Sequence, residues 1–85
     1  MRGRVVCSKA GRDKGKFMVL VGSSDSHFYL CDGKERPLER PKSKIGKHIQ
    51  FTNCVFEEKQ FLTNKSLRRA LAEYRSKDGQ MQVED

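Results

Sequence analysis

The chain has 85 residues and a formal net charge of +7, a size that suits one small domain and argues against a deep catalytic cleft. Lysine and arginine are concentrated in the first fifty residues, which carry 12 basic and five acidic residues, whereas the rest of the chain is neutral overall. This excess indicates a polyanionic partner that binds the first part of the chain.

Cysteine usage and the opening residues indicate the compartment. The segment MRGRVVCSKA lacks the pattern of a secretory signal, and the longest early apolar run, FMVLV, is far shorter than a membrane helix. The cysteines are odd in number, widely spaced and without the C-x-x-C pair of a zinc ribbon: Cys7, Cys31 and Cys54. We therefore expect a cytoplasmic protein with no membrane partner, metal or other cofactor.

Short apolar or alternating runs predict three strands, at residues 4–8, 16–22 and 27–31. The turn-rich segment GSSDS predicts a hairpin connection between the second and third strands. The pair Asp32-Gly33 predicts a second hairpin with a type I′ turn. A short strand near Arg36–Leu38 would follow, confined to a sheet edge by Pro37.

Beyond that point we expect an extended loop, RPKSKIGKH, because the segment is basic and without period. A closing strand would follow with Ile49, Phe51 and, at its end, Val55. A helical spacing of i, i+3, i+4 and i+7 then predicts a helix whose apolar stripe packs as core: Leu67, Ala70, Leu71 and Tyr74. Thr63, Asn64 or Ser66 could cap its start, and we favour Asn64 or Ser66.

These elements predict a mainly β fold, a small and strongly bent β-barrel followed by a short C-terminal α-helix. The helix either packs on the barrel or stands apart from it. We divide the chain into a barrel at 1–56, a helical extension at 57–76 and a disordered tail at 77–85.

The densest basic segment, SKAGRDKGKF at residues 8–17, lies between two predicted strands. It is not a nucleotide-binding loop, because only three residues separate Gly11 from Gly15 and Phe17 replaces the magnesium-binding hydroxyl. The two glycines instead allow positive φ angles around a tight turn that projects basic side chains toward phosphates. A solvated loop whose charge serves solubility is the alternative.

The segment RVVCSKAGRDKGKFMVLV resembles the KOW motif, a strand–loop–strand element of ribosomal proteins and transcription elongation factors. The match consists of apolar residues at Val5 and Val6, the run SKAGRDKG, and apolar residues at Phe17, Val19 and Val21. Through LCDGKERPLERPKSKIGKHIQFTN, the chain is similar to the large-subunit ribosomal protein fourteen family of eukaryotes and archaea. It is closer still to the short KOW-domain RNA-binding proteins of bacteria. The resemblance covers about residues 2–54, and the predicted helix has no counterpart in it.

The resemblance implies an SH3-like barrel of the KOW, translation-protein type that binds ribosomal or other structured RNA without catalysis. In KOW modules the glycine-containing loop between the strands contacts RNA, and that loop here is residues 9–16, with the basic run 36–48 as a second surface. The implied RNA-binding residues are Lys9, Gly11, Arg12, Lys14, Lys16, Arg36, Arg40, Lys42, Lys44, Lys47 and His48. We expect a ribonucleoprotein component of translation that also meets ribosomal proteins; the sequence does not predict its oligomeric state.

Two other function classes have less support in the sequence. KOW barrels also occur in elongation factors, so the chain could be an interaction module that docks on a protein of the transcription machinery through its helix. Arg68 and Arg69 could extend an RNA-binding face, but nearby glutamates favour a solvated helix face. An enzyme is not expected, because the chain has two histidines and no convincing catalytic triad.

Overall fold

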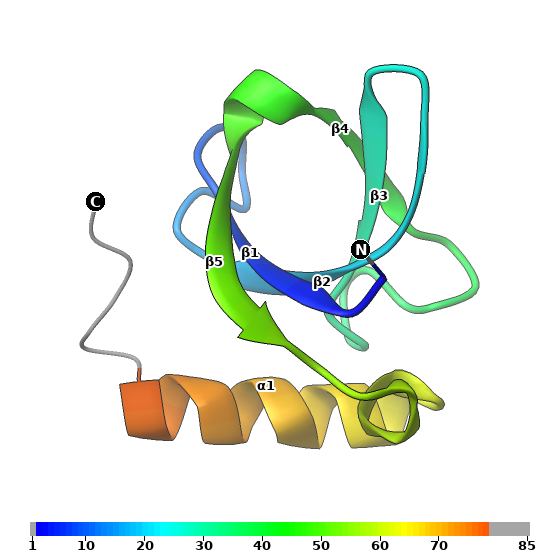
Figure 1. The fold of residues 1–85 in the computed structure, drawn as a ribbon, viewed down its shortest axis with the longest axis vertical. Helices are drawn as coiled ribbons and strands as arrows, with labels where there is room; N and C mark the ends of the chain where they lie inside the picture. Colours follow the sequence, from blue (N-terminus) through cyan, green and yellow to red (C-terminus); the bar gives the residue numbers. More distant parts are fainter. Residues whose placement is uncertain (1, 79–85) are drawn as a thin grey trace.

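The computed structural model describes residues 2–78, apart from the side chains of residues 77 and 78 (Figure 1). The elements in chain order are β1 (Arg4–Ser8), β2 (Phe17–Ser24), β3 (His27–Cys31), β4 (Lys42–Ile45), η1 (Gly46–His48), β5 (Ile49–Val55), η2 (Glu58–Phe61) and α1 (Asn64–Asp78). The η elements are short 3₁₀ helices. No helix in this part of the chain is long and apolar enough to cross a membrane.

The strands form one antiparallel sheet in the order β4-β3-β2-β1-β5. The sheet curves strongly, and η1 carries the chain from the end of β4 to the start of β5 (Figure 1). Register shifts interrupt the β1–β5 ladder between Arg4 and Val6 and the β2–β3 ladder between Leu20 and Gly22. Such irregularities increase local twist and bending. The predicted mainly β domain of short antiparallel strands with one C-terminal helix is confirmed.

Two apolar clusters lie on opposite faces of this sheet, because successive side chains of a strand alternate between faces. The outer cluster joins the sheet to α1 and comprises Val5, Val19, Cys31, Phe56, Phe61, Leu67, Ala70 and Leu71. The inner cluster fills the curve of the sheet and comprises Val6, Met18, Leu20, Leu30 and Ile49. Burial on both faces explains why β2 begins with a continuous apolar run.

The predicted apolar stripe of α1 is confirmed as core, since Leu67, Ala70 and Leu71 are buried in the outer cluster and Tyr74 packs against it. The helix therefore packs on the sheet and does not stand apart (Figure 1). The ring of Tyr74 meets the ring of Phe17 edge to face, with centroids 5.2 Å apart.

The predicted cap of α1 is wrong in its favoured residues. Thr63 precedes the helix, and its Oγ1 accepts the backbone N–H of Ser66 at 3.0 Å. The hydroxyl of Ser66 in turn accepts the N–H of Thr63 at 3.1 Å. Asn64 is unable to cap the helix because its amide oxygen accepts the N–H of Leu38 at 2.8 Å and its amide nitrogen donates to Glu39 at 3.0 Å.

The segment between β3 and β4 also differs from prediction. Residues 36–38 form no strand, and the predicted extended loop at 40–48 instead contains β4 and η1. The carboxylate of Asp32 accepts the N–H groups of Lys34 at 2.9 Å and Arg36 at 2.8 Å, which closes the chain into a loop. Only Gly33 of the expected type I′ pair has a positive φ, so that turn is absent. The strand that pairs with β3 therefore starts later, at Lys42.

The predicted division of the chain at 57–76 and 77–85 falls partly inside the helix. α1 runs to Asp78 and shares its core with the strands, so the helical segment is part of one packed unit. The remainder of the predicted tail, 79–85, lies outside the described residues.

Candidate nucleic-acid interface

The loop between β1 and β2, residues 9–16 and here called the basic loop, is closed by its own backbone. At its base the N–H of Gly15 donates to the carbonyl of Ser8 at 2.8 Å, and the N–H of Ser8 donates to the carbonyl of Lys16 at 3.0 Å. Within the loop, the backbone N–H of Lys14 donates to the carbonyl of Gly11 at 3.2 Å, and the backbone N–H of Lys16 donates to the carbonyl of Asp13 at 2.9 Å. Gly11 and Gly15 have φ angles of +86° and +87°, which favour glycine.

A buried ion pair lies beneath the basic loop. The ammonium of Lys44, on β4, donates to the carbonyl of Ala10 at 2.9 Å and lies 3.3 Å from Oδ1 of Asp13. The hydroxyl of Ser8 donates to the same carboxylate oxygen at 2.9 Å. The side chains of Lys44 and Asp13 are only 7% and 12% exposed. Lys44 therefore has a structural role that replaces the RNA contact expected for it.

The pKa of Asp13 reflects two opposed effects. Burial alone would raise it, but hydrogen bonds from Ser8 and Lys44 and the positive charge of Lys44 outweigh burial and hold the pKa below its ordinary value of 3.8. Asp13 is therefore ionised at neutral pH, and the pair with Lys44 fastens the loop to β4.

The other cations of the basic loop point to solvent. Lys9, Arg12, Lys14 and Lys16 are exposed. The N–H of Lys9 donates to the carbonyl of His48 at 2.8 Å, which fastens the start of the loop to η1. Lys16 also makes an exposed ion pair with Glu35 at 3.2 Å, a contact of small energetic value in water. The loop thus presents several cations on a backbone held at both ends.

The second predicted surface, residues 36–48, is divided by the fold. Arg36 lines a hollow of about 440 Å³ together with Arg12 and Lys16 of the basic loop. Arg40, Lys42, Lys47 and His48 do not line this hollow. The structure therefore brings Arg36 beside the basic loop, and leaves the other predicted residues of this run on or near β4 and η1.

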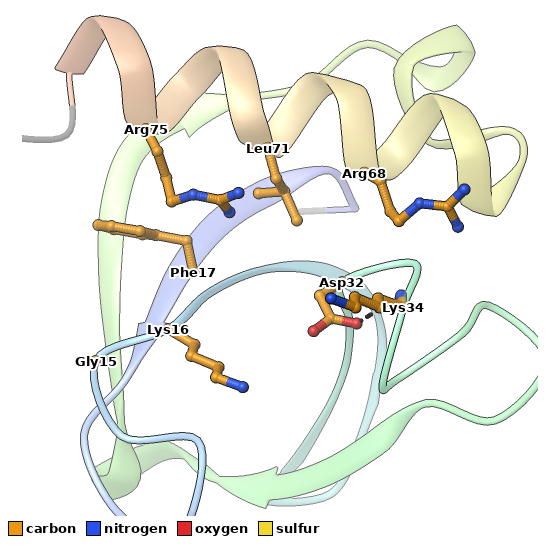
Figure 2. A pocket seen from close by; sticks show the side chains of 8 residues that line it. All are labelled: Gly15, Lys16, Phe17, Asp32, Lys34, Arg68, Leu71 and Arg75. Atoms are coloured by element: carbon orange, nitrogen blue, oxygen red, sulfur yellow. Dashed lines mark hydrogen bonds between the residues drawn. The ribbon is translucent and has the colours of Figure 1, made fainter.

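A larger hollow lies between the basic loop, the loop after β3 and α1, and we call it the helix cleft (Figure 2). Its volume is about 530 Å³. Four cations line it: Lys16, Lys34, Arg68 and Arg75. The half-buried ring of Phe17 supplies apolar surface, and Asp32 supplies one carboxylate. Leu71 also lines the cleft but is buried in the outer cluster. The cleft thus combines positive charge, an apolar wall and a hydrogen-bond acceptor.

Sequence reasoning missed Lys34 and Arg75 and assigned Arg68 to a solvated face. A usable signal existed, because Arg68 and Arg75 are seven residues apart and therefore share one face of a helix, beside the apolar residue Leu71. Arg69 is different, since it lines a separate hollow with Lys59 and Glu73. The position of α1 against the two loops brings Arg68, and not its neighbour Arg69, to the helix cleft.

The thiols of Cys7 and Cys31 do not have the properties of nucleophiles. Burial, with a smaller contribution from the charges of Asp32 and Glu39, raises the pKa of Cys31 to about 11. Burial also raises the pKa of Cys7. Reactive cysteines have lowered pKa values instead. Within residues 2–78, no cluster of histidine, cysteine and acidic side chains could hold a metal ion.

The arrangement can bind a polyanion in two ways. Phosphates can meet the exposed cations of the basic loop, and a ligand with both charge and an apolar part can enter the helix cleft. A scan of protein-family models and a search of curated proteins return no match to this chain, so its contacts and charges are the basis for a function.

Proposed function

We propose that this protein is a non-catalytic RNA-binding protein that binds structured RNA, ribosomal RNA foremost, through the basic loop. The observation that carries the proposal is the rigid presentation of Arg12, Lys14 and Lys16, which are exposed on a loop fastened by the buried pair of Lys44 and Asp13. A loop that is ordered before binding loses little conformational entropy on binding. Its cations neutralise phosphates, and the fold of the RNA supplies the selectivity.

The finer fold assignment belongs to this proposal. An SH3-like barrel of the KOW type is supported by the strong curvature of the five-stranded sheet and by the two register shifts that help to bend it. The basic loop also joins the first two strands, which is the arrangement of the KOW motif that the sequence resembles. On this basis we propose that the protein acts in translation, in the cytoplasm, close to ribosomal proteins.

Docking on the transcription machinery through α1 has less support. An amphipathic helix that docks on a partner presents its apolar face, whereas Leu67, Ala70 and Leu71 are buried against the sheet. The large apolar side chains exposed in the described part of the chain are Val55 and Leu62, which lie outside α1. The exposed faces of α1 are mostly polar.

Removal of the loop cations tests the proposal. The variant Arg12→Ala/Lys14→Ala/Lys16→Ala should bind a ribosomal RNA fragment more weakly, and the slope of log K against log [salt] should fall by about 1 for each phosphate that the protein no longer neutralises. The control Lys59→Ala/Lys65→Ala/Arg69→Ala removes three other exposed cations and the same net charge. Far-UV circular dichroism should be unchanged in both variants. Equal reductions of affinity in the two variants would mean that net charge alone explains the effect, and would refute the assignment of RNA binding to the basic loop.

Sedimentation of cell extract tests the cellular part of the proposal. We expect the protein to travel with large ribosomal subunits at low salt and to be released at high salt, because the contacts are electrostatic. Co-purification with RNA polymerase subunits that resists ribonuclease would instead favour the docking alternative.

A further inference from the structure

We propose that the helix cleft receives an unpaired nucleotide of the RNA that the basic loop binds. This inference rests on the proposed function and deepens it, because it names a second contact and the kind of RNA feature that it recognises. An unpaired nucleotide is the part of a structured RNA that can leave the helical stack and enter a hollow.

The size and lining of the helix cleft fit such a ligand. Its volume of about 530 Å³ lies within the roughly 300–1,000 Å³ of small-molecule sites. A duplex backbone offers only phosphates and sugars, for which cations suffice. Here the half-buried ring of Phe17 adds apolar surface beside the cations of Lys34, Arg68 and Arg75 (Figure 2). Apolar surface next to cations suits a base that is attached to its phosphates.

Arg68 is held in position before any ligand binds. Its Nη1 donates to the carbonyl of Gly33 at 2.9 Å. A guanidinium has five N–H donors, so most of them remain for a ligand. Gly33 itself lies so close to α1 that an added Cβ would be 2.6 Å from the carbonyl oxygen of Asn64. The amide of Asn64 accepts a hydrogen bond from the N–H of Leu38 and donates one to Glu39. Together with these bonds, the close contact at Gly33 fixes the loop after β3 against the start of α1.

Arg75 supplies a second cation along the same wall. It follows Arg68 by two helical turns, about 10 Å along the axis, and Figure 2 shows the two side chains extending from α1 on either side of Leu71. Cations spaced in this way can hold the phosphates on both sides of one nucleotide while its base covers the half-buried ring of Phe17. This spacing is what distinguishes the helix cleft from a simple positive patch.

Asp32 favours a nucleotide over a phosphate alone. Oδ1 of its carboxylate accepts two hydrogen bonds, from the backbone N–H groups of Lys34 and Arg36. The second oxygen can accept a hydrogen bond from a 2′-hydroxyl or a base amino group, both of which are donors. A carboxylate also repels a phosphate, so its place in a cationic hollow selects a ligand that brings a donor to this position.

The test compares two RNA hairpins with equal numbers of nucleotides, one with a single-nucleotide bulge and one with a fully paired stem. Fluorescence anisotropy at one salt concentration gives the affinity of each. The variant Arg75→Glu should weaken binding of the bulged hairpin about tenfold, since it replaces a charge-assisted contact by repulsion, and weaken the paired hairpin far less. Lys34→Ala should act in the same direction. Arg69→Glu, the matched control on the same helix, should change neither affinity more than about twofold.

Each other outcome decides against the inference. Arg12→Ala/Lys14→Ala changes no residue that lines the helix cleft; if it weakens both hairpins while Arg75→Glu weakens neither, the proposed function stands and the inference is wrong. If the wild-type protein binds neither hairpin, both the proposed function and the inference are wrong. Displacement of bulged RNA by polyglutamate as readily as by unlabelled RNA would assign the cleft to an acidic peptide. Should Arg75→Glu fail to fold, Lys34→Ala decides by the same criteria.

Discussion

The ammonium of Lys44 lies 3.3 Å from Oδ1 of Asp13, and this buried contact joins the basic loop to the edge strand β4. The same ammonium donates to the carbonyl of Ala10, so two points of the loop depend on one side chain. Lys44 therefore positions the loop, while the exposed neighbours of Asp13 meet solvent. In the proposed function, Lys44 contributes to RNA binding through the loop and makes no RNA contact of its own.

Replacement of Lys44 should destabilise the fold. Lys44→Met leaves the carboxylate of Asp13 buried without its cation, and breaking a buried pair in this way costs about 3 kcal/mol or more. The free energy of unfolding in urea, followed by circular dichroism, measures the decrease. Lys47→Met, which removes an exposed cation of η1, should leave stability nearly unchanged. Equal midpoints for wild type and Lys44→Met would show that the pair does not hold the loop.

Acid should weaken the fold through Asp13. The folded pKa of Asp13 lies below its ordinary value of 3.8, so its ionised form contributes stability that is complete above the unfolded pKa and is lost as the pH falls through the folded pKa. The free energy of unfolding should therefore fall from about pH 5 to about pH 2, and less steeply in Asp13→Asn.

A second carboxylate provides the control for this pH dependence. The hydrogen bond from Asn64 lowers the pKa of Glu39, which is exposed. Glu39→Gln should therefore keep the part of the acid dependence that Asp13 causes. If Asp13→Asn and wild type lose stability in parallel as the pH falls, Asp13 is not the group responsible.

The strands and the helix could be predicted because their signals are local. The apolar runs of β1, β2 and β3 and the helical spacing of Leu67, Ala70 and Leu71 each predicted an element close to its observed bounds. Strand β4 could not be predicted this way, since its residues, KSKI, carry two lysines and hide the alternation. One of those lysines, Lys44, is buried, and its ammonium is paired there with Asp13, which is far away in sequence.

The candidate site was predictable only in part. The basic loop is one continuous segment, so its glycines and cations could be read together. The helix cleft is assembled from three separate segments, and its cations Lys34 and Arg75 come together only when α1 packs across the outer face of the sheet. The amide of Asn64 illustrates the same limit, because a local rule assigns it to capping whereas the fold uses it to hold Leu38 and Glu39.

Cys31 should be the slowest cysteine to react with iodoacetamide in the folded protein. It is fully buried, and its pKa of about 11 leaves only about one thiol in a thousand ionised at pH 8. Cys7 and Cys54 are only partly buried. Peptide mapping by mass spectrometry after timed alkylation gives the three rates, and unfolding in denaturant should make them similar. Equal rates in the folded protein would mean that the contact between β3 and α1 opens readily.

Substitutions of Gly33 and Gly15 should separate backbone strain from close packing. Both have positive φ angles, +81° and +87°, so alanine at either position costs about 1 kcal/mol in backbone conformation alone. At Gly15 the added Cβ meets open space, whereas at Gly33 it would lie 2.6 Å from the backbone oxygen of Asn64. That oxygen cannot move without displacing the start of α1.

Gly33→Ala should therefore cost about 3 kcal/mol or more in urea unfolding. It should also weaken binding of the bulged RNA hairpin, because Arg68 takes its position from the carbonyl of Gly33. Gly15→Ala, on the basic loop, is the matched control. It should lose only the smaller free energy of unfolding that comes from the backbone conformation, about 1 kcal/mol. Equal destabilisation of the two variants would show that α1 does not rest on this glycine, and the fixed position of Arg68 would be left without support.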